Sequence, residues 1–311
     1  MSTLLEAEHL TKIFTQRGKE SFKAVDDVSF TLKPGETLGI VGESGSGKST
    51  LAKMITRLTD ITEGTLKFEG KDITRLKHNQ LKDVYGNIQM VFQNPVGSFD
   101  PRRTLGDGIG ESLRNRGMKK ADVEKRVAEL LEQCGLEKEY AKRYPHEVSG
   151  GQCQRAAIAR ALAVKPKVLI CDEATGALDV SIQNQIAQLL VKLVEEKNIG
   201  CLFIGHDLAL VRSVSQRIAV MYLGRIVELL ESETLGEKAM HPYTKMLLGS
   251  IFDVYCDQNE EIAAPKGEPP SPLKIRKGCA FAERCSWCSE KCKENVPPLQ
   301  EVEPGHKVAC F

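Results

Sequence analysis

The sequence lacks any long hydrophobic run and any segment typical of a secretory signal peptide. Acidic residues occur within the first ten positions, and the apolar segment 156–164 is interrupted by Arg160. A helix that crosses a bilayer needs ~18 uncharged residues in succession, so no transmembrane segment is predicted. We therefore expect a soluble, intracellular protein that reaches a membrane only through a partner.

The chain also lacks an excess of either charge, internal repeats and low-complexity tracts. Its 43 Lys and Arg residues nearly balance its 42 Asp and Glu residues. This balance provides no overall positive field for nucleic acid or anionic lipid, and we expect no nucleic-acid partner. With 311 residues, the chain is long enough for one large domain and an appendage.

The ten cysteines do not follow the pattern of a secreted, disulfide-bonded protein. Four are scattered through apolar segments, where small buried thiols are common: Cys134, Cys153, Cys171 and Cys201. Five crowd the C-terminal tail: Cys279, Cys285, Cys288, Cys292 and Cys310. Without a secretion signal, such a cluster indicates a metal site more than a disulfide framework.

The hydrophobic pattern predicts strands that alternate with helices. Strands are expected within residues 1–40 and at 87–92, 168–171, 201–205 and 218–222. Helices are expected at 48–58, with Leu51, Ile55 and Leu58 on one face, and at 182–196, while 105–162 is mostly helical. This order implies an α/β fold with a largely parallel sheet and a helical insertion.

The composition changes after residue 250. Residues 257–264 are polar, and residues 265–272 contain four prolines and a glycine, as a linker does. The tail at 273–311 carries the cysteine cluster and little helical or strand pattern.

A phosphate-binding loop is predicted at Gly42-Glu-Ser-Gly-Ser-Gly-Lys48-Ser49, which fits G-x-x-x-x-G-K-[ST]. Its glycines let backbone N–H groups point inward around an anion, at the positive end of the following helix. Lys48 is expected to reach the β- and γ-phosphates, and Ser49 to offer a hydroxyl to Mg²⁺. The flanking strand and helix favour this interpretation over an ordinary glycine-rich turn.

A nucleophile elbow is excluded because Ser46 stands where its second glycine belongs. The candidate nucleotide-binding residues of the loop are Gly42, Ser44, Gly45, Gly47, Lys48, Ser49 and Thr50.

The segment Val168-Leu-Ile-Cys-Asp172-Glu173 is expected to supply two carboxylates to the same chemistry. An apolar strand presents Asp172 at its end, where it can hold Mg²⁺ through water. Glu173 leaves the strand and can orient and deprotonate an attacking water. Alone, these would be two acids facing solvent; downstream of a phosphate loop, the catalytic interpretation is favoured.

Ser149-Gly150-Gly151-Gln152 precedes an alanine-rich segment that is expected to be helical. Ser149 is a good N-cap residue, and the start of such a helix offers N–H groups and a positive dipole end to an anion. The alternative is a capped helix that only packs.

The order of these motifs resembles the ATP-binding cassette (ABC) family, in which one subunit's Ser-Gly-Gly-Gln closes over ATP held by another subunit. The resemblance implies that the chain works as one half of a pair and that Ser149, Gly151 and Gln152 face the partner's ATP. It also implies a RecA-like P-loop NTPase fold with a helical subdomain at about 95–160.

The resemblance assigns roles to four further positions. Gln93 matches the glutamine that senses Mg²⁺ and the γ-phosphate, and His206 matches the histidine that contacts the γ-phosphate. Asp179, in Ala177-Leu178-Asp179, matches the loop through which the subunits communicate. Phe14 aligns with the aromatic residue that stacks on adenine, and Phe22 is a competitor for that role.

Two positions depart from the common family pattern. Gly176 stands where many relatives have serine, which removes a hydroxyl near the subunit interface and loosens the backbone. We expect altered coupling rather than inactivity. Ala174 replaces a proline and is common in the wider family, and Cys153 departs from ABC proteins broadly but fits the subfamily.

Several sequence segments resemble those of the F-type ATPase subunits of oligopeptide and dipeptide importers. They are Lys23–Phe30, Gln89–Pro95, Arg143–His146, Leu178–Gln183, His241–Thr244 and the tail from Gly267 to Cys279. This resemblance implies a sister D-type ATPase, two membrane permeases and an extracytoplasmic solute-binding protein, with the chain at the cytoplasmic face of the membrane. The stretch 94–103 is where a permease helix is expected to dock. We predict a nucleotide-binding domain at 1–235 and an importer-type extension at 236–311.

Cys279, Cys285, Cys292 and Cys310 match the four cysteines of this subfamily's extension. Four thiolates on a short, coreless segment suit an iron–sulfur cluster or structural zinc, and the resemblance implies a [4Fe–4S] cluster. Cys288 creates an additional Cys-x-x-Cys pair that suits Zn²⁺, and His306 is an alternative zinc ligand. Free or disulfide-forming thiols are the remaining alternative.

The function predicted is an ATPase that energises import of di- and oligopeptides. Nickel or a metal chelate is the alternative cargo. A non-transport ABC ATPase in DNA repair or translation is disfavoured, because the chain has neither a long coiled-coil insertion nor a second cassette. A tail that senses redox state is compatible with transport.

Overall fold

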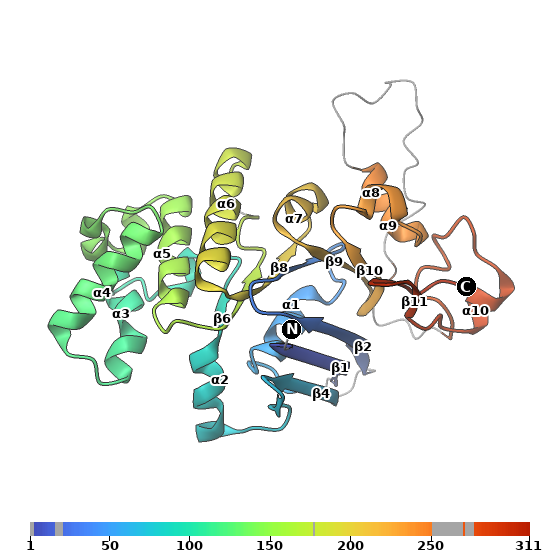
Figure 1. The fold of residues 1–311 in the computed structure, drawn as a ribbon, viewed down its shortest axis with the longest axis horizontal. Coiled ribbons are helices and arrows are strands. Elements are labelled where there is room, and N and C mark those ends of the chain that lie inside the picture. The colour runs from blue at the N-terminus through green and yellow to red at the C-terminus, as the bar shows by residue number, and fades with distance from the viewer. Residues whose placement is uncertain (1–2, 16–20, 177, 251–269, 271–276) are drawn as a thin grey trace. The chain divides into compact units, whose positions relative to one another are not determined.

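The computed structural model describes residues 3–15, 21–176, 178–250, 270 and 277–311. Ala177 and nearly all of the predicted linker lie outside the described residues. The chain divides into two compact units, whose elements are labelled in Figure 1. Unit 1 comprises Met1–Leu4, Leu32–Thr37 and Leu76–Gly205, and unit 2 comprises Leu5–Thr31, Leu38–Arg75 and His206–Phe311.

The strands of unit 1 form a parallel set: β6 (Ile88–Val91), β7 (Val168–Asp172) and β8 (Gly200–Gly205). Strand β7 pairs with β6 on one side and β8 on the other. Every residue of β7 is buried, so its side chains are covered on both faces and the sequence is a continuous apolar run. The predicted strands 168–171 and 201–205 are therefore confirmed.

The helices of unit 1 include the predicted helical insertion. Helices α3 (Leu105–Asn115), α4 (Lys120–Gln133) and α5 (Gly150–Leu162) contact one another, as Figure 1 shows in green. A short 3₁₀ turn, η2 (Val96–Ser98), precedes α3, and two more, η3 (Lys138–Lys142) and η4 (Pro145–Glu147), lie between α4 and α5. The longer α6 (Val180–Lys197) ends at Asn198 in the left-handed conformation.

One helix of unit 1 was not expected. A turn η1 (His78–Gln80) leads into α2 (Leu81–Asn87), and β6 begins only at Ile88. Asn87, predicted as strand, is the last residue of α2. The helix buries only Val84, so its sequence carries little amphipathic signal.

Unit 2 contains an antiparallel sheet of β1 (Leu5–Phe14), β2 (Phe22–Leu32), β4 (Glu63–Phe68) and β5 (Lys71–Asp72), in the order β2-β1-β4-β5. It also contains β3 (Thr37–Val41) and β9 (Arg217–Tyr222), which are parallel, with Ile40 opposite Ala219. Strand β10 (Arg225–Glu231) returns antiparallel to β9. The expectation of a largely parallel sheet thus describes β3 and β6 to β9, but not the N-terminal sheet.

The described helices of unit 2 are short: α1 (Lys48–Ile55), α7 (Leu208–Val214), α8 (Leu235–Lys238), α9 (Pro242–Gly249) and α10 (Glu290–Glu294). Helix α1 ends earlier than predicted, because Arg57 adopts the left-handed conformation. Leu51 and Ile55 are buried as expected, whereas Leu58 lies beyond the helix and is 54% exposed. The placement of Leu58 on the apolar face was therefore wrong.

The C-terminal tail contains strands that the sequence pattern did not predict. Strand β12 (His306–Val308) pairs with β10, with Val308 opposite Glu228, and β11 (Gln300–Glu303) pairs with β12. Their sequence is mostly polar, so pairing with the edge of β10 rather than local propensity decides their conformation.

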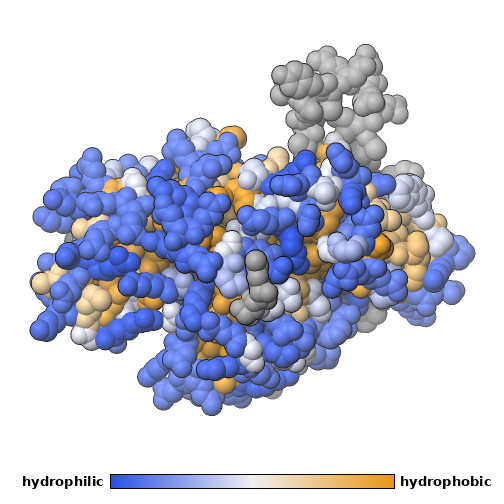
Figure 2. Space-filling view, in the orientation of Figure 1, coloured by the Kyte–Doolittle hydropathy of each residue, from blue (hydrophilic) through white to orange (hydrophobic). Residues whose placement is uncertain are grey.

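None of the helices in the described part of the chain combines the length and hydrophobicity needed to cross a bilayer. Figure 2 agrees with this for the face it shows, where hydrophilic side chains predominate and apolar ones form small separate patches.

Candidate nucleotide-binding site

The predicted phosphate loop lies in unit 2, between the buried strand β3 and the start of α1. At two of its glycines, the backbone of another segment lies so close that no side chain fits. A Cβ at Gly42 would lie 2.1 Å from the carbonyl oxygen of Met221, and one at Gly47 would lie 2.3 Å from that of Ala24. Gly47 is also left-handed, with a φ of 99°. These contacts explain why the loop needs glycine at these positions.

Lys48 lies across the loop and is 4% exposed. Its Nζ donates hydrogen bonds to the carbonyl oxygens of Gly42 (2.7 Å) and Glu43 (3.0 Å) and approaches Ser46 Oγ (3.4 Å). The ammonium group is thus held among the backbone atoms of the loop, where it can act on a bound polyphosphate.

The first turn of α1 has the features of an anion site. Gly47, at the N-cap, provides no side chain to accept from the helix N–H groups. Ser44 and Gly45 are exposed, while Ser49 and Thr50 are half-buried. Backbone N–H groups at the positive end of a helix favour phosphate.

Phe14 and its competitor Phe22 lie side by side in unit 2. Their ring centroids are 5.8 Å apart, and Phe14 is 38% exposed. Lys12 Nζ lies 5.1 Å from the Phe14 ring centroid. Phe22 is half-buried, so the structure shows one aromatic pair with Phe14 as its exposed member rather than two separate candidates for stacking on a base.

In unit 1, Asp172 and Glu173 occupy the carboxyl end of β7, as predicted. Asp172 is 6% exposed, and Glu173 turns away from the strand in the left-handed conformation, with a φ of 47°. The Glu173 N–H donates to the carbonyl of Ile204 at 2.9 Å, which fixes the position of this turn. A left-handed glutamate is unusual and marks a position where side-chain direction is constrained.

Gln93 contacts Glu173 directly. Its Nε2 donates to Glu173 Oε2 at 2.6 Å, across a sequence separation of 80 residues. The structure thus brings together two of the three predicted catalytic side chains, on residues that follow the parallel strands β6 and β7.

Ser149 is the N-cap of α5, as predicted from the sequence. Its Oγ accepts from the Gln152 N–H (3.3 Å), while Gln152 Oε1 accepts from the Ser149 N–H (2.9 Å). Gln152 Nε2 also donates to Tyr140 Oη at 2.8 Å. This capping box holds an exposed helix start in place. A Cβ at Gly151 would approach Ile182 Cγ2 to 2.8 Å, so glycine allows α5 to begin close to α6.

The remaining predicted residues are exposed. Asp179 is the N-cap of α6 but makes no side-chain cap hydrogen bond, and Gly176 lies in the preceding turn, where its N–H donates to the Glu173 carbonyl at 3.0 Å. His206 follows β8 directly and is exposed; Asp207, next to it, caps α7 by accepting from the Leu210 N–H.

The four scattered cysteines are buried, as expected. Burial raises the pKa of Cys153 to about 11 and that of Cys134 to about 12. Cys153 therefore remains a neutral thiol packed inside α5 rather than a reactive group at the helix start.

The tail cysteines gather near one another in unit 2. Burial raises the pKa of Cys279, and the neighbouring thiols of Cys292, Cys285 and Cys310 raise it further. The Cys279 N–H donates to the Cys292 carbonyl at 2.7 Å. This all-thiol donor set has the chemistry of a soft-metal site. Ligand geometry is not in place, however: within the described ranges, no group of three His, Cys, Asp or Glu side chains is arranged to hold a metal ion.

His306, the alternative zinc ligand, is engaged elsewhere. Its Nε2 lies 2.8 Å from Glu228 Oε1, and both residues are buried. Glu228 also accepts from the N–H groups of Met240 and His241, so this carboxylate anchors three segments of unit 2.

Sequence reasoning missed Glu43 and Arg284 as partners. They form a two-point ion pair of 2.8 and 3.0 Å between the phosphate loop and the cysteine-rich tail. Glu43 occupies a variable position of the loop pattern, and Arg284 lies 241 residues away, so no local signal connects them.

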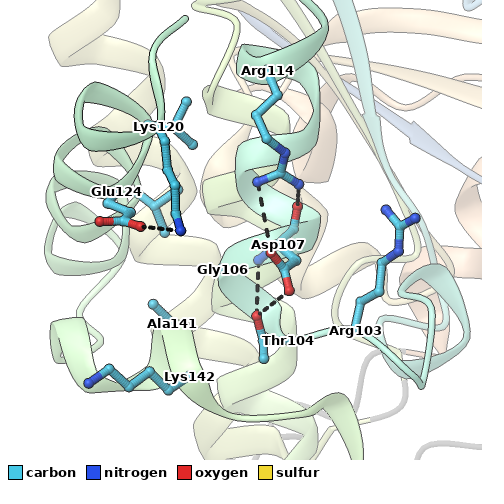
Figure 3. A pocket seen from close by; sticks show the side chains of 11 residues that line it. Arg103, Thr104, Gly106, Asp107, Arg114, Lys120, Glu124, Ala141 and Lys142 are labelled. Atoms are coloured by element: carbon cyan, nitrogen blue, oxygen red, sulfur yellow. Dashed lines mark hydrogen bonds and ion pairs between the residues drawn. The ribbon is translucent and has the colours of Figure 1, made fainter.

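A cavity of about 610 Å³ lies in unit 1 among α3, α4 and η3 (Figure 3). Its wall combines apolar residues with ion-paired and hydrogen-bonded ones: Lys120 pairs with Glu124 at 3.9 Å, and Arg114 Nη2 donates to the Asp107 carbonyl at 2.6 Å. The predicted nucleotide-binding residues do not line it. Arg103, the last residue of the stretch expected to meet a permease, does.

Two protein families match this chain. Residues 25–176 match the ABC transporter family, and residues 227–292 match the C-terminal region of oligopeptide/dipeptide transporters. Among curated relatives, the oligopeptide transport ATP-binding protein AppF of Bacillus subtilis is 46% identical over 318 residues, which cover 99% of this chain and 97% of AppF. The di/tripeptide transport ATP-binding protein DppF of Pseudomonas aeruginosa is 40% identical, over 100% of this chain and 98% of DppF.

Solved structures show the same fold. The ATP-binding cassette MJ0796, in a dimeric post-hydrolysis state with ADP and phosphate, is 32% identical with a TM-score of 0.68, over 74% of this chain and 99% of that one. CbiO1 of Clostridium perfringens, part of a cbiONQ transporter complex, is 28% identical with a TM-score of 0.68, over 76% of this chain and 92% of that one. The chain therefore belongs to the ATP-binding proteins of ABC transporters, and to the group within them that carries the oligopeptide/dipeptide transporter C-terminal region.

Proposed function

We propose that this chain is the ATP-hydrolysing subunit of an ABC importer and that it energises uptake of di- and oligopeptides. The observation that carries the proposal is the similarity over nearly the whole chain, C-terminal region included, to relatives named for peptide transport. The contact between Gln93 and Glu173 supports hydrolysis, because it orders the two side chains that water activation requires.

Glu173 is the general base. Its carboxylate takes a proton from the water that attacks the γ-phosphorus, and the left-handed backbone at Glu173 sets the direction of the side chain. Gln93 holds one carboxylate oxygen through its amide N–H and leaves the other to accept from water. His206 contacts the γ-phosphate as a hydrogen-bond donor.

Lys48 and the loop amides bind the β- and γ-phosphates, and Phe14 stacks on the adenine. The ammonium of Lys48 exchanges backbone carbonyl partners for phosphate oxygens when nucleotide binds. Ser49, Gln93 and Asp172 have the oxygen donors that suit Mg²⁺, which when bound neutralises charge on the phosphates.

The chain acts with a sister D-type ATPase, as one half of a heterodimer. Ser149, Gly151 and Gln152 face the ATP held by the partner, because the capped start of α5 is exposed and offers backbone N–H groups. Asp179, at the start of α6, communicates between the subunits.

Two permeases and an extracytoplasmic solute-binding protein complete the importer and place the chain at the cytoplasmic face of the membrane. A permease helix docks on residues 94–103, where Asn94, Val96 and Gly97 are exposed. Arg103 continues this stretch to the cavity beside α3 and α4, which it lines.

Cys279, Cys285, Cys292 and Cys310 would hold a [4Fe–4S] cluster, with Zn²⁺ as the alternative, through their four thiolates. The hydrogen bond from the Cys279 N–H to the Cys292 carbonyl, 2.7 Å long, supports the proximity of two of these residues. Iron, zinc and sulfide analysis of anaerobically purified protein tests the assignment, with Cys288→Ser as the control expected to retain the metal and Cys292→Ser expected to lose it. A colourless, metal-free protein with full activity would rule out both metals.

Cargo is tested by uptake of labelled di- and oligopeptides, alongside nickel, in cells that carry Glu173→Gln. Loss of peptide uptake alone supports the proposal. Loss of nickel uptake alone assigns the same ATPase mechanism to metal import. If neither uptake changes, peptide import by this chain is contradicted, provided that no other ATP-binding subunit takes the place of this chain in the importer.

A further inference from the structure

Glu43, the second residue of the phosphate loop, is bound at two points by the C-terminal part of the chain. Arg284 Nη1 donates to Glu43 Oε2 at 2.8 Å, and Nη2 donates to Oε1 at 3.0 Å. The Glu43 N–H donates to Tyr243 Oη at 2.8 Å. Both the side chain and the backbone of this loop residue are therefore fixed from outside the loop.

Arg284 and Tyr243 are themselves rigidly placed. The Arg284 side chain is 3% exposed and Tyr243 is fully buried. The rings of Tyr222, Tyr243 and Phe281 form a cluster, with centroids 4.6 to 5.5 Å apart. The Arg284 guanidinium carbon lies 5.8 Å from the Tyr222 centroid and 5.7 Å from that of Phe281. A bidentate pair held in such surroundings fixes orientation as well as charge.

The backbone of Glu43 participates in the nucleotide site. Its carbonyl accepts from Lys48 Nζ at 3.0 Å and from the Ser46 N–H at 3.2 Å. Any rotation of the Glu43 peptide would displace the acceptors that hold Lys48 over the loop. Fixing Glu43 therefore fixes the loop backbone as far as the Ser46 N–H, and with it the place from which Lys48 turns to the phosphates.

We propose that Arg284 and Tyr243 are positioning residues that preorganise the phosphate loop for ATP, so that the C-terminal extension is part of the nucleotide site. The proposal rests on the function proposed above, because it concerns the same ATP. Preorganisation lowers the cost of ordering the loop when ATP binds, so its loss weakens ATP binding. The hydrolysis step, in which Glu173 acts as the base, does not depend on this preorganisation.

The test is the KM for ATP and kcat of full-length Tyr243→Phe and Arg284→Gln in the assembled importer. Tyr243→Phe removes only the hydroxyl and keeps the ring packing. We expect the KM for ATP to rise about threefold in Tyr243→Phe and about tenfold in Arg284→Gln, with kcat within about twofold of wild type.

Glu43→Gln and the double variant Glu43→Gln/Arg284→Gln test whether the two residues act as a pair. The double variant is expected to have the same KM as Arg284→Gln alone, because one interaction is lost in each. Arg284→Lys, which keeps the charge but not the two-point geometry, is expected to recover part of the affinity.

If Arg284 and Tyr243 only hold the C-terminal extension in place, their variants lose stability but keep the affinity for ATP. Lys238→Gln breaks another ion pair of the extension, that of Lys238 with Glu303 at 2.6 Å, and does not touch the loop. If Arg284→Gln and Tyr243→Phe lower the Tm as Lys238→Gln does but leave the KM for ATP unchanged, the proposal is overturned. Absence of ATP hydrolysis in the wild-type importer would instead refute the proposed function. Metal content is measured for each variant, so that an effect on Cys285 is not mistaken for one on the loop.

Discussion

At the scale of single residues, Glu173 offers the sharpest separation of ATP binding from hydrolysis. Glu173→Gln keeps the size of the side chain and an oxygen that can accept from Gln93 Nε2, but loses the basic carboxylate. We expect hydrolysis to fall about 100-fold or more while the affinity for ATP is retained, since a general base contributes on that order. Phosphate release and nucleotide binding are measured on the same preparation.

Glu196→Gln is the matched control for this substitution. Glu196 lies on the exposed side of α6, where it pairs weakly with Lys192 at 3.8 Å, and its replacement is expected to leave both measurements unchanged. A wild-type rate in Glu173→Gln would show that another group activates the water.

At the scale of elements, two substitutions of Ser149 separate the role of the cap in stabilising α5 from the role of the helix start in binding phosphate. Ser149→Ala removes the acceptor for the Gln152 N–H and is expected to cost about 1 kcal/mol of stability. Ser149→Asp caps equally well, so stability is retained, but its negative charge repels phosphate, and ATP hydrolysis by the proposed heterodimer is expected to fall. Thermal unfolding and ATPase rates distinguish the two variants. Equal hydrolysis by Ser149→Asp and wild type would leave α5 with a packing role only.

His241, at the start of α9, makes the stability of the protein depend on pH. His241 is 2% exposed, caps the helix by accepting from the Tyr243 N–H, and has its pKa lowered by burial from 6.5 to about 4. Between these values the unfolded chain binds a proton at His241 that the folded chain does not. Stability therefore falls as the pH drops from 6.5 to 4, by up to about 3 kcal/mol for this group.

His241→Asn is the variant that checks this contribution, because asparagine caps a helix but does not titrate. Unfolding free energies are compared from pH 7 to pH 4. Glu228, which accepts from the His241 N–H, and its partner His306 are present in both proteins, so the difference between the two curves isolates His241. Identical curves would contradict the role of the neutral imidazole.

At the scale of the whole molecule, the proposed heterodimer predicts that damage to α5 lowers hydrolysis at the partner's site. Ser149→Arg places a bulky cation where the partner's γ-phosphate is expected. Hydrolysis at the partner's site is predicted to fall about 100-fold, as when a transition-state contact is lost, while this chain's own loop binds ATP normally. Site-specific labelling with a photoreactive ATP analogue reports the two loops separately. Reduced labelling of this chain's loop would mean that its α5 acts on its own ATP.

Prediction from the sequence was most complete where function depends on neighbouring residues. The phosphate loop is contiguous, and its glycines, lysine and flanking apolar strand each have a local chemical reason. The Ser149 cap and the buried strand before Asp172 are local in the same way, and the structure confirms both. Helix α2 was missed because it buries only Val84 and so carries little amphipathic signal. Strand β12 was missed because its conformation depends on pairing with β10, which is distant in the chain.

The sequence by itself determined the α/β class, the family and the identity of the chemical groups, because motif spacing and hydrophobic period are encoded along the chain. Only the tertiary structure decided which groups meet. It placed Gln93 on Glu173, Phe14 against Phe22 and His306 on Glu228. It also joined Arg284 to Glu43, which links the tail to the phosphate loop. Such contacts depend on strand order and burial, so no pattern of nearby residues contains them.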